Sequence, residues 1–294
     1  MRPLPALMLA ALLSACTTPA PPPAATAAAP APLAAPRPGP NVEAEVAQLR
    51  ASLVAEVPHA MLLAPSDADQ WILRTQAAVR AADFAIDRPE LLVVVDRAPS
   101  VQALMIVLAR PDGPWEVIGG SRVSTGQSGR RGYFITPTGV FPHTDAILDY
   151  RAEGTYNENH IRGLGVRGMR VWDFGWQTAE KGWTATPETG EIRLLMHATD
   201  PDVLEPRIGR PASKGCVRIP AAMNVFLDRH GVLDADIERA AQDDRRFAAV
   251  LRPDRVPTPL AGDALVVIDS GTAPPPLPAA PVPTATLPPL GRAC

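Results

Sequence analysis

The sequence predicts a mainly β domain with some α-helix, preceded by a short helical segment. Short apolar runs rich in β-branched residues, bounded by Pro, Gly and Asp, recur between residues 91 and 270 and are typical of strands. Apolar residues at helical spacing come before them, from Val42 to Val57. Segments rich in Pro and Ala lie at both ends of the chain and cannot bury enough apolar surface to fold.

The N-terminal residues have the pattern of a secretory signal. Arg2 precedes an apolar run from Leu4 to Leu13, and small residues follow it. Leu13-Ser14-Ala15-Cys16 also matches the bacterial lipobox, so residues 1–15 are expected to be removed and Cys16 to carry lipid. The alternative is an ordinary signal peptide in which Cys16 is incidental. Residues 16–40 are expected to be a tether, and residues 271–294, which end in Cys294, a disordered Pro-rich tail.

Two helices are expected in residues 41–90. The first is indicated by Val42, Val46, Leu49, Leu53 and Val57, which lie on one helical face. The second is expected to be capped within Ser66-Asp67-Ala68-Asp69 and to run to about Asp83. The role of this helical preface stays open.

Residues 91–270 carry the pattern of a sheet. The expected strands are Leu91 to Val95, Val101 to Leu108, Trp115 to Ile118, Ile192 to Met196 and Leu265 to Ile268. Two helices are expected within this region. One runs from Pro220 to Gly231, with Pro at its first turn and Gly past its end, and the other from Asp234 to about Ala248.

The stretch between Phe141 and Glu191 is rich in Gly, Arg and aromatic residues, including Trp172, Trp176 and Trp183. Two interpretations stay open, because aromatic side chains serve both. The stretch is either a packed satellite core or a lid over a substrate groove.

His197 and Cys216 are the candidate reacting pair. Only a thiolate is strongly nucleophilic, so an imidazole must take the thiol proton and a turn must expose the sulfur. The alternatives are a buried Cys acting as a small apolar residue and a structural His on a strand. Asp200 lies near His197 in sequence, but none of these residues has the spacing of a zinc motif, so no metal or cofactor is expected.

This region resembles the signature of the YkuD-type L,D-transpeptidases, which remodel the peptide stems of bacterial peptidoglycan. The resemblance is carried by His197 followed by Ser213-Lys214-Gly215-Cys216-Val217-Arg218. Val123 to Gly126 and Thr136 to Phe141 resemble two further family segments, in the expected order. The resemblance covers residues 91–270 and implies a β-sandwich-like L,D-transpeptidase catalytic domain.

The resemblance also implies roles for the catalytic group. Cys216 is expected to be the nucleophile and His197 the base, with its ring oriented by the carbonyl of Ala198, where the family more often has Gly. Ser213 is expected to brace the turn. Backbone N–H groups, with Gly215 allowing close approach, are expected to form the oxyanion site.

Substrate contacts are expected on both sides of Cys216. Arg218 is expected to brace the turn or bind a carboxylate. Lys214 stands where many members have His, which leaves donor specificity open. Trp172 and Trp176 are the candidates in the aromatic stretch. The helix after Pro220 is expected to help stabilise a thiolate through its N-terminal dipole.

The implied activity is that of a peptidoglycan L,D-transpeptidase. Cys216 would attack the carbonyl of a stem peptide's L,D bond, expel a D-amino acid and hold the acyl group until an amine of a neighbouring stem accepts it. The alternatives are an L,D-carboxypeptidase, a wall-protein-releasing amidase of the same family, and a non-catalytic peptidoglycan-binding lipoprotein. Carbapenems are expected to be covalent inhibitors.

Charge and cysteine content fit this interpretation. A net charge of -3 argues against a nucleic-acid binder, and 3 cysteines in 294 residues do not make a disulfide scaffold. Thr17 rather than Asp follows Cys16, which by the rule for bacterial lipoproteins favours the outer membrane. The expected location is the periplasm, with the lipid anchor in the inner face of the outer membrane.

Overall fold

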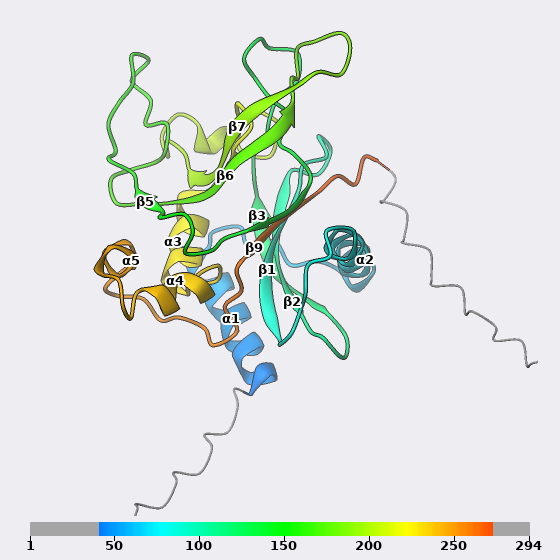
Figure 1. Ribbon diagram of the computed structural model, residues 1–294, viewed down its shortest axis with the longest axis vertical. Coiled ribbons are helices and arrows are strands. Elements are labelled where there is room, and N and C mark those ends of the chain that lie inside the picture. Colours follow the sequence, from blue (N-terminus) through cyan, green and yellow to red (C-terminus); the bar gives the residue numbers. More distant parts are fainter. Residues whose placement is uncertain (1–40, 273–294) are drawn as a thin grey trace, which may run out of the picture. The chain divides into compact units, whose positions relative to one another are not determined.

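The computed structural model describes residues 41–272, which form a mixed α/β fold (Figure 1). Of these residues, 27% are in strands and 24% in helices, so helix contributes nearly as much as strand. The helices are α1 (Val42–Glu56), α2 (Pro65–Ala81), α3 (Ala221–Arg229), α4 (Ala235–Ala240) and α5 (Arg245–Val250). The expected lipidation site Cys16, the tether and almost all of the tail with Cys294 lie outside the described residues.

Sheet A has five strands in the order β3-β2-β1-β9-β4. Its strands are β1 (Glu90–Asp96), β2 (Ala103–Ala109), β3 (Glu116–Arg122), β4 (Gly139–Pro142) and β9 (Ala264–Ile268). β1 pairs antiparallel with β2 and parallel with β9, and every residue of these three strands is buried. Burial on both faces explains why these strands are continuous apolar runs rather than alternating ones.

Sheet B has four strands in the order β5-β6-β7-β8. Its strands are β5 (Tyr150–Arg151), β6 (Arg170–Glu180), β7 (Thr189–Ala198) and β8 (Val217–Ile219). β6 and β7 form a long antiparallel hairpin, and β8 adds to β7 in parallel. The edge of β8 is covered in turn by the segment that follows β3, because Ser124 bridges to Arg218 and Gly126 bridges to Ser213.

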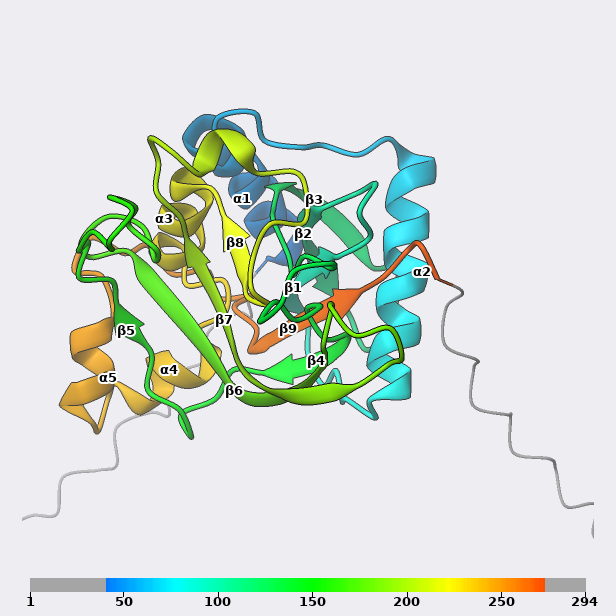
Figure 2. The same cartoon turned by 90° about the horizontal axis from the view of Figure 1, so that it is seen from above.

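Apolar side chains pack on both faces of sheet A. One face, with Leu91, Val93 and Val95, packs against α1, α3 and the inner face of sheet B. The other face, with Leu92 and Val94, is covered by α2 through Trp71 and Val79. Figure 2 shows α2 along one side of sheet A and sheet B with α3 on the other. The two N-terminal helices therefore pack against opposite faces of sheet A, each within its own apolar cluster.

Several sequence predictions are confirmed, with shifts of a few residues. α1, α2, α3, β1, β2, β3, β7 and β9 lie where strands or helices were expected. The predicted side-chain cap of the second helix is wrong, because α2 begins after Ala64 without a side-chain cap and with Pro65 in its first turn. The single helix predicted from Asp234 is also wrong. The chain breaks after Ala240, and Asp244 caps a separate helix, α5.

The stretch from Phe141 to Glu191 is not a single lid or satellite core. It contains β5 and all of β6, the strand that joins β5 to β7 in sheet B. Only the connecting loops around it are free to cover a groove. Within residues 41–272, no helix combines the length and apolar character that crossing a membrane requires.

Candidate active site

The imidazole of His197 is held at the end of β7 by its own neighbour. The side chain is buried, and its Nδ1 lies 2.5 Å from the carbonyl oxygen of Ala198. A carbonyl can only accept a hydrogen bond, so Nδ1 carries the proton and Nε2 has a free lone pair. This tautomer is the one that a general base acting through Nε2 requires. The expected contact between His197 and the Ala198 carbonyl is present.

Cys216 lies on the same face of sheet B as His197. The parallel register of β7 and β8 places Met196 opposite Val217 and His197 opposite Arg218. Extended by one residue, the register places Cys216 opposite Leu195. Side chains alternate along a strand, so Cys216 and His197 are diagonal neighbours on adjacent strands and project to one side.

The protonation states of this pair are set by burial. Burial lowers the pKa of His197 to about 4, although the Ala198 hydrogen bond acts against it, and the charge of Arg218 lowers it further. Burial raises the pKa of the Cys216 thiol, although a backbone hydrogen bond from Leu195 and the charge of Arg218 lower it. At neutral pH the resting thiol and imidazole are therefore both neutral, and the thiol donates to the Arg193 carbonyl at 3.8 Å. A thiol in this state needs a base to take its proton as it forms a new bond.

The turn before Cys216 is closed by hydroxyl groups. Ser213 Oγ donates to the Cys216 carbonyl at 2.6 Å and accepts the Gly215 N–H at 3.0 Å, as expected for a bracing residue. Thr136 Oγ1 donates to the Gly215 carbonyl at 2.7 Å and accepts the Gly126 N–H at 2.8 Å. The turn is thereby fixed to two segments distant in sequence.

Glycine is required at position 215. Its φ is +132°, in a region that other residues rarely adopt, and a Cβ there would lie 2.9 Å from Ile192 Cδ1. Because its N–H is donated to Ser213, the Gly215 N–H is not available to a reacting carbonyl. The absence of a side chain at Gly215 is compatible with the close approach that was expected there, and the oxyanion site stays a prediction.

The expected help from the helix dipole is not supported. β8 lies between Cys216 and α3, which places the first residue of α3 roughly 15 Å along the chain from Cys216. The dipole effect falls off within the first turn of a helix. In addition, the first N–H of α3, on Ala221, is bonded by the Glu205 carboxylate at 2.9 Å.

The expected substrate-binding residues separate into two groups. Lys214 and Arg218 line an open cleft beside the turn, together with Tyr133. Trp172 is 0% exposed and packs in the main core, so it is not available to a substrate and the expectation is corrected for this residue. Trp176 is 64% exposed and lies beside the Arg193 guanidinium, which remains compatible with ligand contact.

Sequence reasoning assigned no role to Thr136 or Gln102, although both support the site. Gln102 receives the Thr125 N–H at 2.8 Å and donates to Thr125 Oγ1 at 2.8 Å, which fixes the segment that borders β8. The Thr-Pro-Thr-Gly motif was a signal for Thr136. Gln102 has a φ of 45°, but it stands in no motif that marks it.

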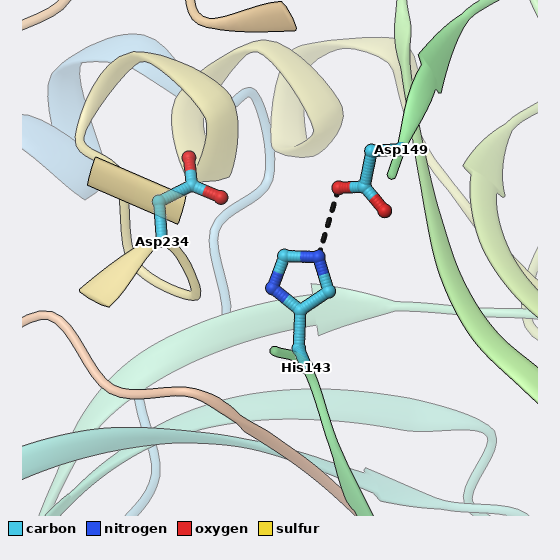
Figure 3. Close-up of side chains that lie close together, drawn as sticks. All are labelled: His143, Asp149 and Asp234. Atoms are coloured by element: carbon cyan, nitrogen blue, oxygen red, sulfur yellow. Dashed lines mark hydrogen bonds and ion pairs between the residues drawn. The ribbon is translucent and has the colours of Figure 1, made fainter. Parts of the chain in front are cut away.

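A second polar cluster, which includes His143 after β4, Asp149 before β5 and Asp234 before α4, is buried in the fold (Figure 3). His143 Nε2 lies 2.8 Å from Asp149 Oδ2, and its Nδ1 lies 2.7 Å from the Leu233 carbonyl. Arg170 contacts Asp149 at 2.8 Å and Asp234 at 3.1 Å. These residues come from three separate parts of the chain, so their approach was not predictable from sequence spacing.

Ligand atoms of His143, Asp149 and Asp234 lie within 4.8 Å of one another, close enough to hold a metal ion. The contacts favour a structural role instead. Both ring nitrogens of His143 already have partners, and the buried Arg170 supplies positive charge to the carboxylates. Burial lowers the pKa of His143, but the charge and hydrogen bond of Asp149 more than offset this, so the pKa lies above its usual value. A protonated His143 has no lone pair for a metal.

No protein family matches the chain, and no curated protein shows significant similarity to it.

Proposed function

We propose that the protein is a cysteine acyltransferase of the L,D-transpeptidase type, acting on peptide stems of peptidoglycan. The observation that carries the proposal is the placement of Cys216 and His197 on one face of two adjacent parallel strands, with the His197 ring oriented by the Ala198 carbonyl. The braced turn and the order of motifs support it. The two packed sheets of residues 91–270 are compatible with the β-sandwich-like catalytic domain that the resemblance implies.

In this mechanism Cys216 attacks the carbonyl carbon of the peptide bond while Nε2 of His197 takes the thiol proton. A C–S bond forms, and the carbonyl oxygen becomes an oxyanion facing backbone N–H groups of the Cys216 turn. Collapse breaks the C–N bond, and His197 returns its proton to the departing amine. The thioester is then attacked by an acceptor amine, whose proton passes to His197, and the thiol is restored.

The neutral resting pair has a chemical consequence for this mechanism. A thiol whose pKa is raised is protected from adventitious alkylation, and an imidazole with a pKa of about 4 is unprotonated and able to accept a proton. The thiol would therefore lose its proton only when the substrate is bound, and the resting enzyme would hold no thiolate. The lipid anchor at Cys16 and the location at the inner face of the outer membrane belong to the same proposal.

The test is turnover of tetrapeptide-bearing muropeptides by the purified full-length protein, with products identified by mass spectrometry. Crosslinked dimers would identify a transpeptidase, and shortened tripeptides a carboxypeptidase. Cys216→Ala and His197→Gln are expected to abolish either product, whereas Cys294→Ser is expected to leave turnover unchanged. Binding without any product by the wild-type protein would overturn the proposal and favour a peptidoglycan-binding lipoprotein.

A further inference from the structure

A polar cleft of about 630 Å³ opens beside the Cys216 turn. It is bordered by the loop around residues 157–163, by residues 204–212 and by Lys214, and Arg218 lies in its wall. Arg218 is fixed there by two backbone hydrogen bonds with Ser124, at 2.8 and 2.9 Å. The cleft is thus built against β8, the strand that begins directly after the candidate nucleophile.

Positive charge dominates the lining of this cleft. The lining includes one acidic side chain, Glu158. It includes five basic side chains: Arg130, Arg207, Arg210, Lys214 and Arg218. Most other basic side chains of residues 41–272 are paired with an acid, for example Arg50 with Glu116 and Arg97 with Asp269. Within those residues, none of the five has such a partner. Unpaired cations gathered in a concavity focus a positive potential that attracts anions.

Three buried polar atoms of the lining also lack partners. Ser124 Oγ, Thr199 Oγ1 and Arg218 Nε form no hydrogen bond in the described part of the chain. The Ser124 and Thr199 side chains are 2% and 0% exposed, so their hydroxyls are removed from bulk water. Leaving a buried polar group without a partner is costly. Because these atoms are enclosed in the wall, the groups that can contact a ligand in the cleft are its exposed basic side chains, such as Arg207 and Arg210.

The Arg218 guanidinium adds a more specific signal. Among the described residues its side chain forms one hydrogen bond, to the Ala212 carbonyl at 3.3 Å, which leaves most of its donors unused. Burial lowers the pKa of Arg218, as expected of a guanidinium removed from water without a counter-ion. A guanidinium matches the two oxygens of a carboxylate with parallel hydrogen bonds.

We propose that this cationic cleft binds a peptide bearing at least two carboxylates, with one carboxylate at Arg218 and a second between Arg207 and Arg210. The inference deepens the proposed function and rests on it, because such a peptide is the acyl donor that would present its carbonyl to Cys216. Bound there, a carboxylate also neutralises the charge that acts on His197, which makes the imidazole a better base as the substrate arrives.

Binding can be measured apart from chemistry with the full-length Cys216→Ser protein. Calorimetric titration with a tetrapeptide muropeptide is compared with titration of the same muropeptide after methyl esterification of its carboxylates. Tricarballylate serves as a free oligocarboxylate probe and pyrophosphate as a phosphate probe. We expect esterification to weaken binding at least tenfold, and tricarballylate to bind more tightly than pyrophosphate.

Variants then assign the binding to the cleft. Arg207 and Arg210 are exposed, so Arg207→Gln with Arg210→Gln is expected to fold normally and to weaken binding of the muropeptide and of tricarballylate at least tenfold. Arg131→Gln is the control, because Arg131 is exposed but does not line the cleft. Equal affinity in the double variant, or preference for pyrophosphate, would overturn the inference. If the double variant binds tricarballylate more weakly but the wild type shows no turnover, the carboxylate-binding cleft stands and only the proposed function is rejected.

Discussion

Nδ1 of His197 lies 2.5 Å from the carbonyl oxygen of Ala198, one residue further along β7. The two groups belong to adjacent residues of one strand, so the imidazole is oriented by the backbone and needs no third side chain. The sequence departs here from the glycine that the resemblance would favour, yet the carbonyl performs the expected contact. Substitutions of the Ala198 side chain should therefore matter less than any change that moves the end of β7.

Alkylation of Cys216 should depend on pH in a way that reports its burial. Burial favours the neutral thiol, so the pKa is raised, and the rate of iodoacetamide labelling should reach half its maximum at a pH above that of a free cysteine, about 8.5. Arg218→Gln removes a positive charge that lowers this pKa and should move the profile to still higher pH. Labelling is followed on the Cys216 peptide by mass spectrometry, with Arg131→Gln as control. A profile centred below that of free cysteine would contradict this account.

The same pKa values set the acid limit of turnover. Because His197 has a pKa of about 4, the base stays unprotonated through the neutral range, and kcat/KM should fall on the acid side only as pH approaches about 4. A fall in kcat/KM centred near pH 6.5, the pKa of a solvated imidazole, would show that burial does not control the pKa of His197.

Thr136→Val should loosen the Cys216 turn while preserving side-chain shape. The variant removes the acceptor of the Gly126 N–H and the donor to the Gly215 carbonyl. Leaving these two buried groups without partners should lower the free energy of unfolding by about 1–3 kcal/mol for each. We expect kcat to fall more than KM rises. Thr138→Val, at an exposed position of the same motif, should change neither quantity in denaturant titration or steady-state kinetics.

Asp149→Asn should destabilise the protein by about 3–5 kcal/mol, because it leaves Arg170 and His143 buried with a charge partner removed. Asp145→Asn, at an exposed position nearby, should be neutral. Loss of less than 1 kcal/mol would show that the buried cluster is not a charged network.

The pH dependence of the free energy of unfolding should distinguish the contribution of Asp149 from that of His143. Burial raises the pKa of Asp149, but His143 and Arg170 more than offset this, so its net pKa is lowered. Its contribution is present above the unfolded value, about 3.9, and is lost as pH falls through the folded value. The pKa of His143 is raised, so its contribution is present below about 6.5 and is lost as pH rises through the folded value. Denaturant unfolding from pH 3 to 9 should show both limbs in the wild type and smaller limbs in Asp149→Asn.

Sheet A was predictable because its inner strands are buried on both faces. Leu91 to Val95 and Leu265 to Ile268 are apolar at every position, which distinguishes them from helices at that length. β6 was missed because it begins with the buried Arg170 and contains Asp173 and Gly175, which do not follow strand alternation. The charge of Arg170 is compensated only by carboxylates that approach it in the folded structure.

The candidate site was predictable where a motif is local. The turn from Ser213 to Cys216 is a contiguous signal, and its bracing by Ser213 needs only short-range contacts. The cationic cleft and the Arg170 cluster join residues far apart in the chain, so spacing alone could not reveal them. The break between α4 and α5 was hidden because Asp244, which caps α5, lies inside a run of polar residues that suits an exposed helical face.

The central claim is that Cys216 accepts an acyl group from a peptide-like carbonyl. Intact-mass spectrometry of the full-length protein after incubation with meropenem, and separately with a tetrapeptide muropeptide, tests it directly. The account predicts a covalent adduct with each, mapped to Cys216 and absent from Cys216→Ser. No adduct from either compound, with a Cys216 thiol that iodoacetamide still alkylates in the folded protein, would contradict it.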